Sequence, residues 1–287
     1  MIYIIIPVFN RLNYTLACLK SLSHQSIDDY KIIVVDHGSS DGTSDAIKSE
    51  FPDVVLIYGS SDLWWTGATN LGVREVLNIA ADDDLVLVIN NDLVVEHDYL
   101  ETLLSLHKQI PRSVIGSISV NINNPEKIVF AGVKWNNKTA KFRPARSLNE
   151  PYSSFKLKEE YYQSDLLPGR GTLIPVAAFK EVGIFDEARF PHYAADEDLS
   201  LMCKLKGYQV LIATNAIVKS HVEDTGLNFV HKKLGLSQFI KTLSSIKSSN
   251  NLSIRLRWAK KNAPYPYLYY SFDLMRLFGS YIRSSLR

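Results

Sequence analysis

The sequence predicts an α/β protein in which a mixed, mostly parallel sheet is flanked by helices. Short apolar runs alternate with helical patterns along most of the chain, as in proteins that build parallel sheets. The expected strands are apolar throughout, which is typical of parallel strands buried on both faces. Polar clusters follow three of these strands. The fold class is therefore Rossmann-like, and a basic helical appendage is expected at the C-terminal end.

The first half of the chain gives the clearest elements. Residues 2–6 are apolar and rich in β-branched side chains, and we expect this strand to stop at Pro7. Apolar residues at helical spacing then alternate with further apolar runs. Helices are expected at residues 13–23, 43–50 and 70–80, and strands at residues 31–35, 54–58 and 85–90.

The second half is less regular. Residues 134–165 are polar and have the composition of a loop. Residues 167–187 predict a loop, a strand and a helix. A helix at residues 196–206 begins with three acids and ends before Gly207, as helix capping favours. Further strands are expected at residues 209–213 and 216–218.

Composition indicates a globular protein inside the cell. A length of 287 residues, with 46% hydrophobic and 22% charged residues, allows one large domain or a domain with an appendage. Cys18 and Cys203 fall in apolar helical patterns, which predicts reduced core thiols. The apolar N-terminal run has no basic leader and meets Pro7 early, so we expect no signal peptide and a cytoplasmic location.

Charge is unevenly distributed along the chain. The net charge is +2, yet residues 231–287 carry 11 Lys or Arg and one acid. Residues 1–230 carry 21 Lys or Arg and 29 acids. This asymmetry predicts two parts with different surroundings, a domain at residues 1–228 and a helical region at residues 229–287. No nucleic acid partner is expected.

Three polar clusters are expected to meet at one edge of the sheet. They are residues 7–10, 36–41 and 90–92, and each follows a predicted strand. Ligands of open α/β sheets bind outside the carboxyl ends of the strands. Asp36 predicts either a local turn or an acceptor for the imide N–H of a pyrimidine base. Residues 90–92 predict either a turn or a site for a metal ion and a phosphate.

Several common sites are absent from the sequence. No G-x-G-x-x-G follows a strand and no G-x-x-x-x-G-K-[ST] occurs, which argues against dinucleotide-binding and P-loop proteins. H-E-x-x-H and G-x-S-x-G are also missing. A nucleotidyltransferase would need a basic, glycine-rich loop after the first strand, and PVFNRLN is not one.

A family resemblance rests on five segments taken in order. IIPVFNR, VVDHGSSDGT, NLG, INND and ADEDLSL resemble the inverting glycosyltransferases of family 2, which have the GT-A fold. The likeness covers residues 1–225. LWWTGATNLG is similar to a rhamnosyltransferase-like branch that extends bacterial surface polysaccharides. The resemblance implies a nucleoside-diphosphate-sugar donor.

The resemblance also implies a set of donor-binding residues. Phe9 and Asn10 would line the nucleotide pocket, and Asp36 would read the base. For Trp65 the alternative is core packing, whereas a small polar loop opening a helix at Thr66 suits an anion. The full nucleotide-sugar set is Pro7, Phe9, Asn10, Asp36, Asp41, Trp65, Thr66, Asn70, Asn90, Asn91 and Arg170.

The metal motif of the family is Asp-x-Asp, and this chain has Asn90-Asn91-Asp92 in its place. One carboxylate is kept, so the resemblance implies a divalent cation, Mn²⁺ or Mg²⁺, held more weakly than by two carboxylates. His221 is the second expected metal ligand, since family members bring a late histidine to the metal. A surface histidine at a strand end is the alternative.

The predicted general base is Asp196. The family pattern Glu-Asp-x-Asp places its second acid there, although its first acid falls on Ala195. An inverting transfer needs a carboxylate that takes the proton of the acceptor hydroxyl. Glu197 and Asp198 are the alternatives, and Asp198 has the position of a structural acid. Arg170 lies between two glycines and is expected either to pair with phosphate or to occupy a plain turn.

The C-terminal region is basic and rich in Tyr and Phe, and a helix is expected from about Tyr267. Such a helix suits the interface of an anionic membrane, and it would explain a lipid-linked acceptor. Packing on the catalytic domain or in a homodimer is the alternative. The protein would then be cytoplasmic, with peripheral contact to the inner face of the plasma membrane.

The predicted function is transfer of a sugar from a UDP- or dTDP-linked donor, dTDP-rhamnose being one candidate, to a hydroxyl of a saccharide acceptor. The acceptor is expected to be lipid-linked and the setting to be bacterial surface polysaccharide assembly. A nucleotide-sugar-binding protein without catalysis is the main alternative, because Asn90 and Ala195 replace acids of the family.

Overall fold

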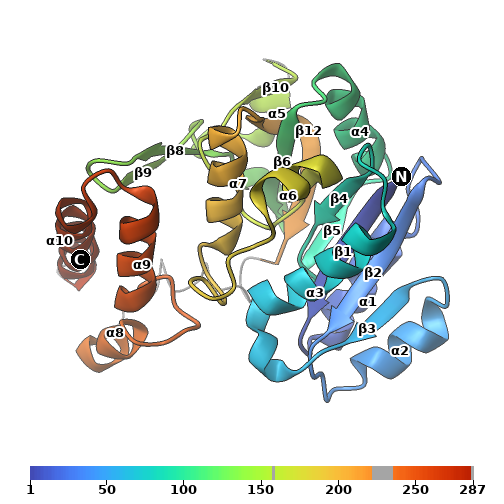
Figure 1. Ribbon diagram of the computed structural model, residues 1–287, viewed down its shortest axis with the longest axis horizontal. Helices are drawn as coiled ribbons and strands as arrows, with labels where there is room; N and C mark the ends of the chain where they lie inside the picture. The colour runs from blue at the N-terminus through green and yellow to red at the C-terminus, as the bar shows by residue number, and fades with distance from the viewer. Residues whose placement is uncertain (157–158, 222–234, 286–287) are drawn as a thin grey trace.

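The computed structural model describes residues 1–156, 159–221 and 235–285 (Figure 1). The strands are β1 (Ile2–Val8), β2 (Tyr30–Asp36), β3 (Val55–Tyr58), β4 (Leu85–Val88), β5 (Leu93–Val95), β6 (Ser113–Asn121), β7 (Asn124–Phe130), β8 (Val133–Asn136), β9 (Lys141–Pro144), β10 (Tyr161–Gln163), β11 (Thr172–Pro175) and β12 (Gln209–Ser220). The helices are η1 (Ser61–Leu63), α1 (Leu12–Leu22), α2 (Thr43–Glu50), α3 (Trp64–Ile79), α4 (Tyr99–Gln109), α5 (Tyr152–Lys156), α6 (Val176–Val182), α7 (Ala195–Leu205), α8 (Leu236–Thr242), α9 (Leu252–Asn262) and α10 (Pro266–Ser285).

A mixed sheet forms the centre of the part of the molecule built from residues 1–221. Its strand order is β10-β12-β6-β11-β4-β1-β2-β3, with β5 paired to β12 and β7 paired to β6. The pairs β3–β2, β2–β1, β1–β4 and β6–β12 are parallel. β11 is antiparallel to both β4 and β6, between which it lies. The predicted mixed, mostly parallel α/β fold is confirmed.

Two apolar layers cover the two faces of the sheet. Successive side chains of a strand point to opposite faces, so Ile4 and Ile6 of β1 join one layer while Tyr3 and Ile5 join the other. Helices α1, α2 and α4 cover the first face, and α3, α6 and α7 the second. Cys18 and Cys203 are free thiols, one in each layer, as predicted.

Four predictions are wrong in detail, the first being that residues 209–213 and 216–218 form two strands, since both belong to β12. β1 continues through Pro7 to Val8, because the β4 pairing ends at Ile5 and no strand on that side needs the N–H that proline lacks. Helix α3 begins at Trp64, not at Asn70, so the expected polar loop is helical. Residues 134–165 contain more than a loop, because β8 and β9 form a hairpin there and α5 and β10 follow.

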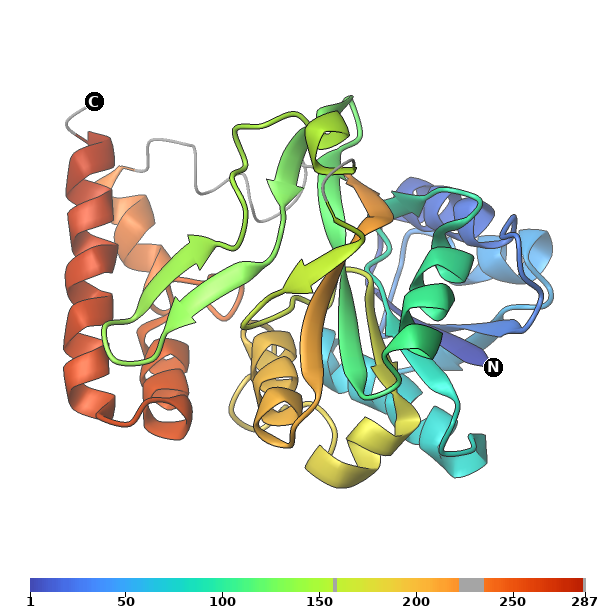
Figure 2. The same ribbon diagram turned by 90° about the horizontal axis from the view of Figure 1, so that it is seen from above.

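The C-terminal helices form a separate layer at one end of the molecule (Figure 2). The Tyr269 hydroxyl accepts hydrogen bonds from the indole N–H groups of Trp135 on the hairpin and Trp258 on α9, at 2.9 and 3.1 Å. Lys261 of α9 also pairs with Asp198 of α7 at 2.7 Å. The C-terminal layer is therefore joined to the β8–β9 hairpin and to α7 by polar contacts as well as by burial.

The predicted domain boundary at residue 228 lies outside the described residues and stays a prediction. Within residues 1–156, 159–221 and 235–285, no helix combines the length and apolar character needed to cross a membrane.

Candidate active site

The loop after β1 is held in an uncommon backbone conformation. Asn10 and Arg11 both have left-handed backbones, with φ of 59° and 66°. Such positions cost about 1–2 kcal/mol for residues with a Cβ, so neighbouring contacts must hold them. The Asn10 side-chain oxygen accepts a hydrogen bond from the Ser40 N–H at 2.8 Å, and the Asn10 N–H donates to Ser39 Oγ at 2.7 Å. The first two polar clusters are thus joined directly.

Asp36 ends β2 and is buried. One carboxylate oxygen accepts hydrogen bonds from the N–H groups of Gly38 and Ser39, at 3.1 and 2.8 Å, and the other accepts from the Ser44 hydroxyl. The turn predicted at Asp36 is therefore present. The first oxygen uses both of its lone pairs, whereas the second keeps one, so the same group can still accept a hydrogen bond from a ligand.

Asp41 connects two helix starts. Its carboxylate accepts hydrogen bonds from the Leu12 N–H at 2.9 Å and from the Thr43 hydroxyl at 2.5 Å. Those groups lie at the first turns of α1 and α2, whose N–H groups have no partner inside the helix. These hydrogen bonds lower the pKa of Asp41 although desolvation opposes the shift. Asp41 therefore fixes the two loops that carry Asn10 and Asp36.

Phe9 and His37 form an aromatic pair above these loops. Their rings are stacked with centroids 5.3 Å apart, and Phe9 is exposed. Burial lowers the pKa of His37, so its ring is neutral near pH 7. His37 Nδ1 is buried and has no hydrogen-bond partner in the described structure. The pair offers a planar, apolar surface and one unused polar atom to a ligand.

The three residues after β4 have different surroundings. The Asn90 side-chain oxygen accepts a hydrogen bond from the Trp65 indole N–H at 2.8 Å. The Asn91 amide donates to Thr15 Oγ1 of α1 at 2.9 Å. Asp92 is buried, and its Oδ1 has no hydrogen-bond partner in the described structure. Of the three side chains, Asp92 is therefore the one that presents an unused acceptor.

A divalent cation fits this site through Asp92. A buried carboxylate oxygen without a partner is a suitable ligand for a hard cation, which completes its shell with water and phosphate oxygens. The Arg11 guanidinium lies 3.3 Å from Asp92 Oδ2 and occupies the other oxygen. The described residues contain no group of three or more His, Cys, Asp or Glu that could hold a metal. Most of the cation's ligands would therefore come from the donor.

The negative charges of Asp92 and Asp196 both act on the buried guanidinium of Arg170. Burial lowers the pKa of its guanidinium, and the negative charges of both acids oppose that shift. Its Nη2 donates to Ser220 Oγ at the end of β12, while its Nε is buried and has no partner in the described structure. A buried guanidinium with a free N–H donor is well suited to an anionic ligand.

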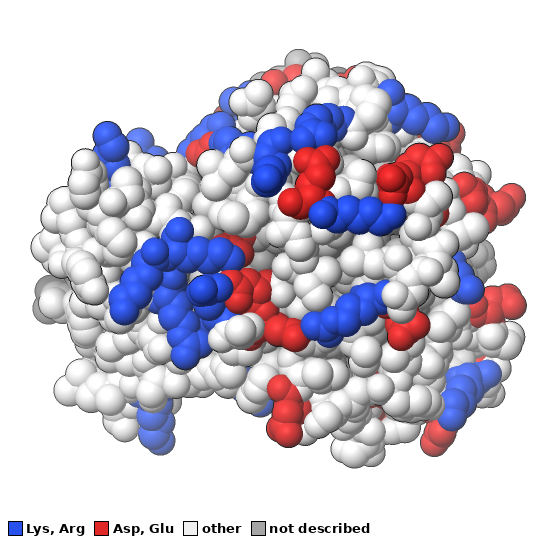
Figure 3. Space-filling model, viewed as in Figure 1, with Lys and Arg blue, Asp and Glu red and all other residues white. Residues whose placement is uncertain are grey.

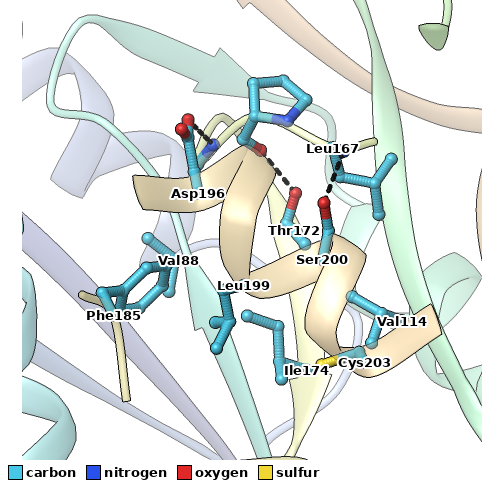
Figure 4. A pocket seen from close by; sticks show the side chains of 12 residues that line it. Val88, Val114, Leu167, Thr172, Ile174, Phe185, Asp196, Leu199, Ser200 and Cys203 are labelled. Atoms are coloured by element: carbon cyan, nitrogen blue, oxygen red, sulfur yellow. Dashed lines mark hydrogen bonds between the residues drawn. The ribbon is translucent and has the colours of Figure 1, made fainter. Parts of the chain in front are cut away.

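Asp196 is the second residue of α7 and is fixed by backbone donors (Figure 4). The Gly169 N–H donates to its Oδ2 at 2.7 Å and the Glu197 N–H donates to its Oδ1 at 3.0 Å. Burial beside an apolar cavity lined by Val88, Leu199 and others raises the pKa of Asp196, although these donors and Arg170 oppose the rise. Burial, and then the Asp196 charge, raise the pKa of Glu197 to about 8.

Asp198 has the structural role that the sequence suggests. It is buried, and it accepts hydrogen bonds from Lys261 at 2.7 Å and from the Asn262 amide at 3.0 Å. Its carboxylate is therefore occupied by the C-terminal layer. Of the three consecutive acids, Asp196 and Glu197 remain available for chemistry.

Trp65 contacts both Asn90 of the third polar cluster and Gly169, whose N–H holds Asp196. Its indole donates to Asn90, and its ring lies so close to Gly169 that a Cβ there would come within 2.3 Å of it. Gly169 is therefore required for this contact. The neighbouring residues Thr66 and Asn70 were expected at a ligand, yet both are fully buried in α3.

The buried side chains of Thr66 and Asn70 hold the segment before α7. Thr66 Oγ1 donates to the Phe190 carbonyl at 2.6 Å. The Asn70 amide donates to the Phe185 carbonyl and to Glu187, both at 2.8 Å, and its oxygen accepts from the Phe185 N–H at 3.1 Å. These side chains therefore act on the protein itself, because no loop exists to present them to an anion.

His221 follows β12 directly and stacks at an angle on Tyr14 of α1, with centroids 4.5 Å apart. Its neighbour Ser220 accepts the Arg170 hydrogen bond, so His221 starts from the same edge of the sheet. The residues after it, up to 234, lie outside the described structure. Its metal role stays a prediction.

Sequence reasoning missed three residues of this edge. Arg11 was part of the first motif but was not assigned to Asp92, a contact across 81 positions of the chain. His37 and His192 each carry a buried Nδ1 without a partner in the described structure. Burial lowers the pKa of His192 to about 4. The sequence offered one signal for each histidine: His37 directly follows Asp36, and His192 lies four positions before Asp196.

Solved structures with the same fold are glycosyltransferases. The chain aligns over 99% of its length with GalNAc-T7 in complex with UDP, GalNAc and Mn²⁺, at a TM-score of 0.62 and 11% identity, and spans 57% of that chain. A mannosyltransferase from Pyrobaculum calidifontis in complex with GDP-Man and Mn²⁺ aligns over 99% of this chain and 73% of its own, at a TM-score of 0.61 and 12% identity. The fold is therefore that of a GT-A glycosyltransferase.

Sequence comparison gives the family. A model described as glycosyl transferase family 2 matches residues 3–182, and the chain therefore belongs to this family of transferases. An N-acetylglucosaminyl-diphospho-decaprenol L-rhamnosyltransferase of Mycobacterium tuberculosis is 26% identical over 218 residues, which cover 71% of this chain and 70% of the relative. An uncharacterised glycosyltransferase of Rickettsia typhi is 25% identical and covers 85% of this chain and 73% of the relative. The predicted resemblance is confirmed at the level of the family.

Proposed function

We propose that the protein is an inverting glycosyltransferase that moves a sugar from a UDP- or dTDP-linked donor to a hydroxyl of a lipid-linked saccharide. The observation that carries this proposal is geometric: Asp92 follows β4 with an unpaired buried oxygen, Arg170 donates to Ser220 at the end of β12, and the N–H of Gly169, next to Arg170, holds Asp196. Asp92 supplies an acceptor oxygen on the side of the expected phosphates, Arg170 supplies a buried positive charge, and Asp196 supplies a carboxylate base. The rhamnosyltransferase relative, named for a diphospho-decaprenol acceptor, supports dTDP-rhamnose and bacterial surface polysaccharide assembly as the setting.

The nucleoside is assigned to the loops after β1 and β2. Phe9 and His37 form a stacked surface on which a pyrimidine can lie, and aromatic rings favour such offset stacking. Asp36 can accept the imide N–H of the base through the remaining lone pair of the oxygen that Ser44 contacts. Asn10 and Asp41 fix the loop geometry through their hydrogen bonds. Pro7, buried at the end of β1, shapes the same wall.

The diphosphate is assigned to the space between Asp92 and Arg170. A divalent cation held by Asp92 and by His221 would supply charge neutralisation to the leaving group when bound. Arg170 supports the same anion from the protein side, because its free Nε–H is buried where a charge-assisted hydrogen bond is strong. Asn90, fixed by Trp65, and Asn91, fixed by Thr15, keep Asp92 in position.

The chemical step is assigned to Asp196. Its carboxylate takes the proton of the acceptor hydroxyl while that oxygen attacks the anomeric carbon. The bond from this carbon to the diphosphate oxygen breaks, and the diphosphate leaves with the electron pair. A single displacement inverts the anomeric configuration. The two backbone donors that hold Asp196 support this role by fixing its orientation.

Two substitutions test the assignment. Asp196→Asn is expected to keep donor binding and to lower transfer by about 10²-fold or more, the usual contribution of a general base. Asp92→Asn is expected to weaken donor binding as well as transfer. Asp82→Asn, at an exposed ion pair with Lys180, is the control. Unchanged sugar transfer in both site variants would overturn the proposal.

A further inference from the structure

The outer face of α10 is apolar and is more than half exposed among the residues that the structure describes. Tyr269, Asp273 and Leu277 repeat every four residues and are buried on the inner side of the helix. On the opposite side, Leu268, Met275 and Ile282 repeat every seven residues, so they lie in one line along the helix. They are 54%, 60% and 55% exposed. We call these three residues the outer stripe.

Helix α8 extends the apolar surface at the same end of the molecule. Its Phe239 is buried and stacks on Tyr281 of α10, with centroids 4.0 Å apart and the rings nearly parallel. Leu236 and Ile240 of α8, four residues apart, are mostly exposed. In Figures 1 and 2, α10 is the outermost element, on the side away from the sheet. The exposed fractions leave the outer stripe uncovered by any described residue.

The charges around this apolar surface have one sign. Residues 235–285 contain eight Lys or Arg and a single acid, Asp273. Asp273 is buried and paired with Arg255 at 2.6 Å. Every exposed charged side chain in this part of the chain is therefore basic. Arg276 and Arg283 each follow a stripe residue directly and are exposed.

The space-filling view agrees with this distribution. Lys and Arg gather over α9, and the area over α10 at the left edge is mostly uncharged (Figure 3). Of the cations of α9, Arg257 and Lys260 are exposed, whereas Arg255 is paired with Asp273, and Lys261 with Asp186 and Asp198. An apolar surface beside a cationic one matches an interface whose interior is apolar and whose outer layer is anionic.

We propose that the outer stripe binds the surface of an anionic phospholipid bilayer, with α10 lying along the membrane plane. The apolar side chains enter the boundary region, while the neighbouring cations meet lipid phosphates. A second copy of this chain is a poorer occupant, because its equivalent surface carries the same positive charge. The contact is peripheral, since none of the described helices can span a bilayer.

The proposed membrane contact lies beside the active-site edge. Lys247, in the loop between α8 and α9, lies 5.6 Å from the centre of the Trp64 ring. Trp64 begins α3, and the next residue, Trp65, lies against Gly169, whose N–H holds Asp196. A bound bilayer would thus bring a lipid-linked acceptor toward the site, a step that rests on the proposed function. Lipid binding itself does not depend on the chemistry.

Sedimentation with vesicles tests the proposal on the full chain. The protein is expected to sediment with vesicles of phosphatidylcholine and phosphatidylglycerol, and far less with phosphatidylcholine alone. Added salt should weaken the binding, because exposed charges are screened. Replacing the outer stripe with serine in one triple variant is expected to weaken binding about tenfold or more. Leu205→Ser, at a 72% exposed residue on α7, is the matched control.

Three outcomes would overturn the proposal. The first is equal sedimentation of the wild type and the triple variant, with unchanged melting temperatures showing that both are folded. The second is absence of binding to either vesicle. The third is a dimer of the wild type, seen by light scattering without lipid, that the triple variant dissolves. Transfer to a water-soluble acceptor should be the same in the variant, so loss of lipid binding is distinguishable from failure of the proposed chemistry.

Discussion

Asn70 provides a sharp test of whether a family motif residue serves the ligand or the fold. Its side chain is fully buried in α3 and uses its oxygen and both amide hydrogens on the segment that leads to α7. Asn70→Ala would remove three hydrogen bonds. The structure predicts that this change destabilises the protein and leaves donor binding by the folded molecule intact.

The expected magnitude follows from the groups left behind. The N–H and C=O of Phe185 lose their partner, and Phe185 is buried. An unsatisfied buried group costs about 1–3 kcal/mol, so two such groups cost about 2 kcal/mol or more. Glu187 is part-exposed and its carboxylate can bind water instead, so the loss of its hydrogen bond from Asn70 adds little. For a chain of this size, about 2 kcal/mol corresponds to a fall of about 4 °C in melting temperature.

Thermal unfolding, with and without a nucleotide-sugar donor, measures both quantities. Asn78→Ala is the matched control, because Asn78 is exposed on the same helix. The control should melt within about 1 °C of the wild type, as surface substitutions usually do. The reasoning is refuted if Asn70→Ala melts like the wild type while the donor no longer stabilises it. That result would return Asn70 to the donor site.

Three further predictions concern the acid pair, the C-terminal layer and the metal motif. Because burial raises the pKa of Glu197 to about 8, the folded state holds a proton that the unfolded state loses above its ordinary value of about 4.3. Stability should therefore fall as the pH rises from 5 to 8, and Glu197→Gln should show a smaller fall in melting temperature. Tyr269→Phe leaves the buried indole N–H of Trp258 and the part-buried indole N–H of Trp135 without an acceptor and should cost about 1–3 kcal/mol, measured by thermal unfolding against Tyr267→Phe. Asn90→Asp restores the second carboxylate of the family motif and should make donor binding about tenfold more responsive to Mn²⁺ in titrations.

Each of these predictions has a result that contradicts it. A parallel pH profile for Glu197→Gln would mean that this carboxyl titrates normally in the folded protein. Equal melting of the two tyrosine variants would mean that water replaces the Tyr269 hydroxyl. An identical Mn²⁺ response in Asn90→Asp would mean that residue 90 lies outside the cation's reach.

Local patterns predicted β1 to β4, but they missed β5 to β10 and the start of α3. The first four strands were found because each is an uninterrupted apolar run bounded by polar residues, and burial on both faces demands that composition. The start of α3 was missed because Thr66, Gly67 and Asn70 are weak helix formers. Their burial and their bonds to residues 185–190 compensate for that weakness. Those partners are more than 110 positions away in the chain and leave no local signal.

The sequence nominated the members of the candidate site but not their connections. Polar residues at strand ends nominated Asp36 and Asp92, because parallel strands bring their carboxyl ends to one edge, and the family resemblance nominated Asp196. The contact of Arg11 with Asp92 depends on a left-handed backbone that no residue type demands there. The Trp65 indole taking the Asn90 oxygen depends on where α3 begins. Both details follow from tertiary packing.

The tyrosine that accepts two indole N–H groups has a mechanical consequence. Tyr269 ties α10 to the hairpin through Trp135 and to α9 through Trp258, so the outer helix has little freedom to swing on its own. The orientation of α10 relative to the sheet edge that carries the candidate active site is thus set when the chain folds. A surface that binds α10 would therefore fix the orientation of the whole enzyme on that surface. An acceptor held at the surface would then approach the enzyme from one side.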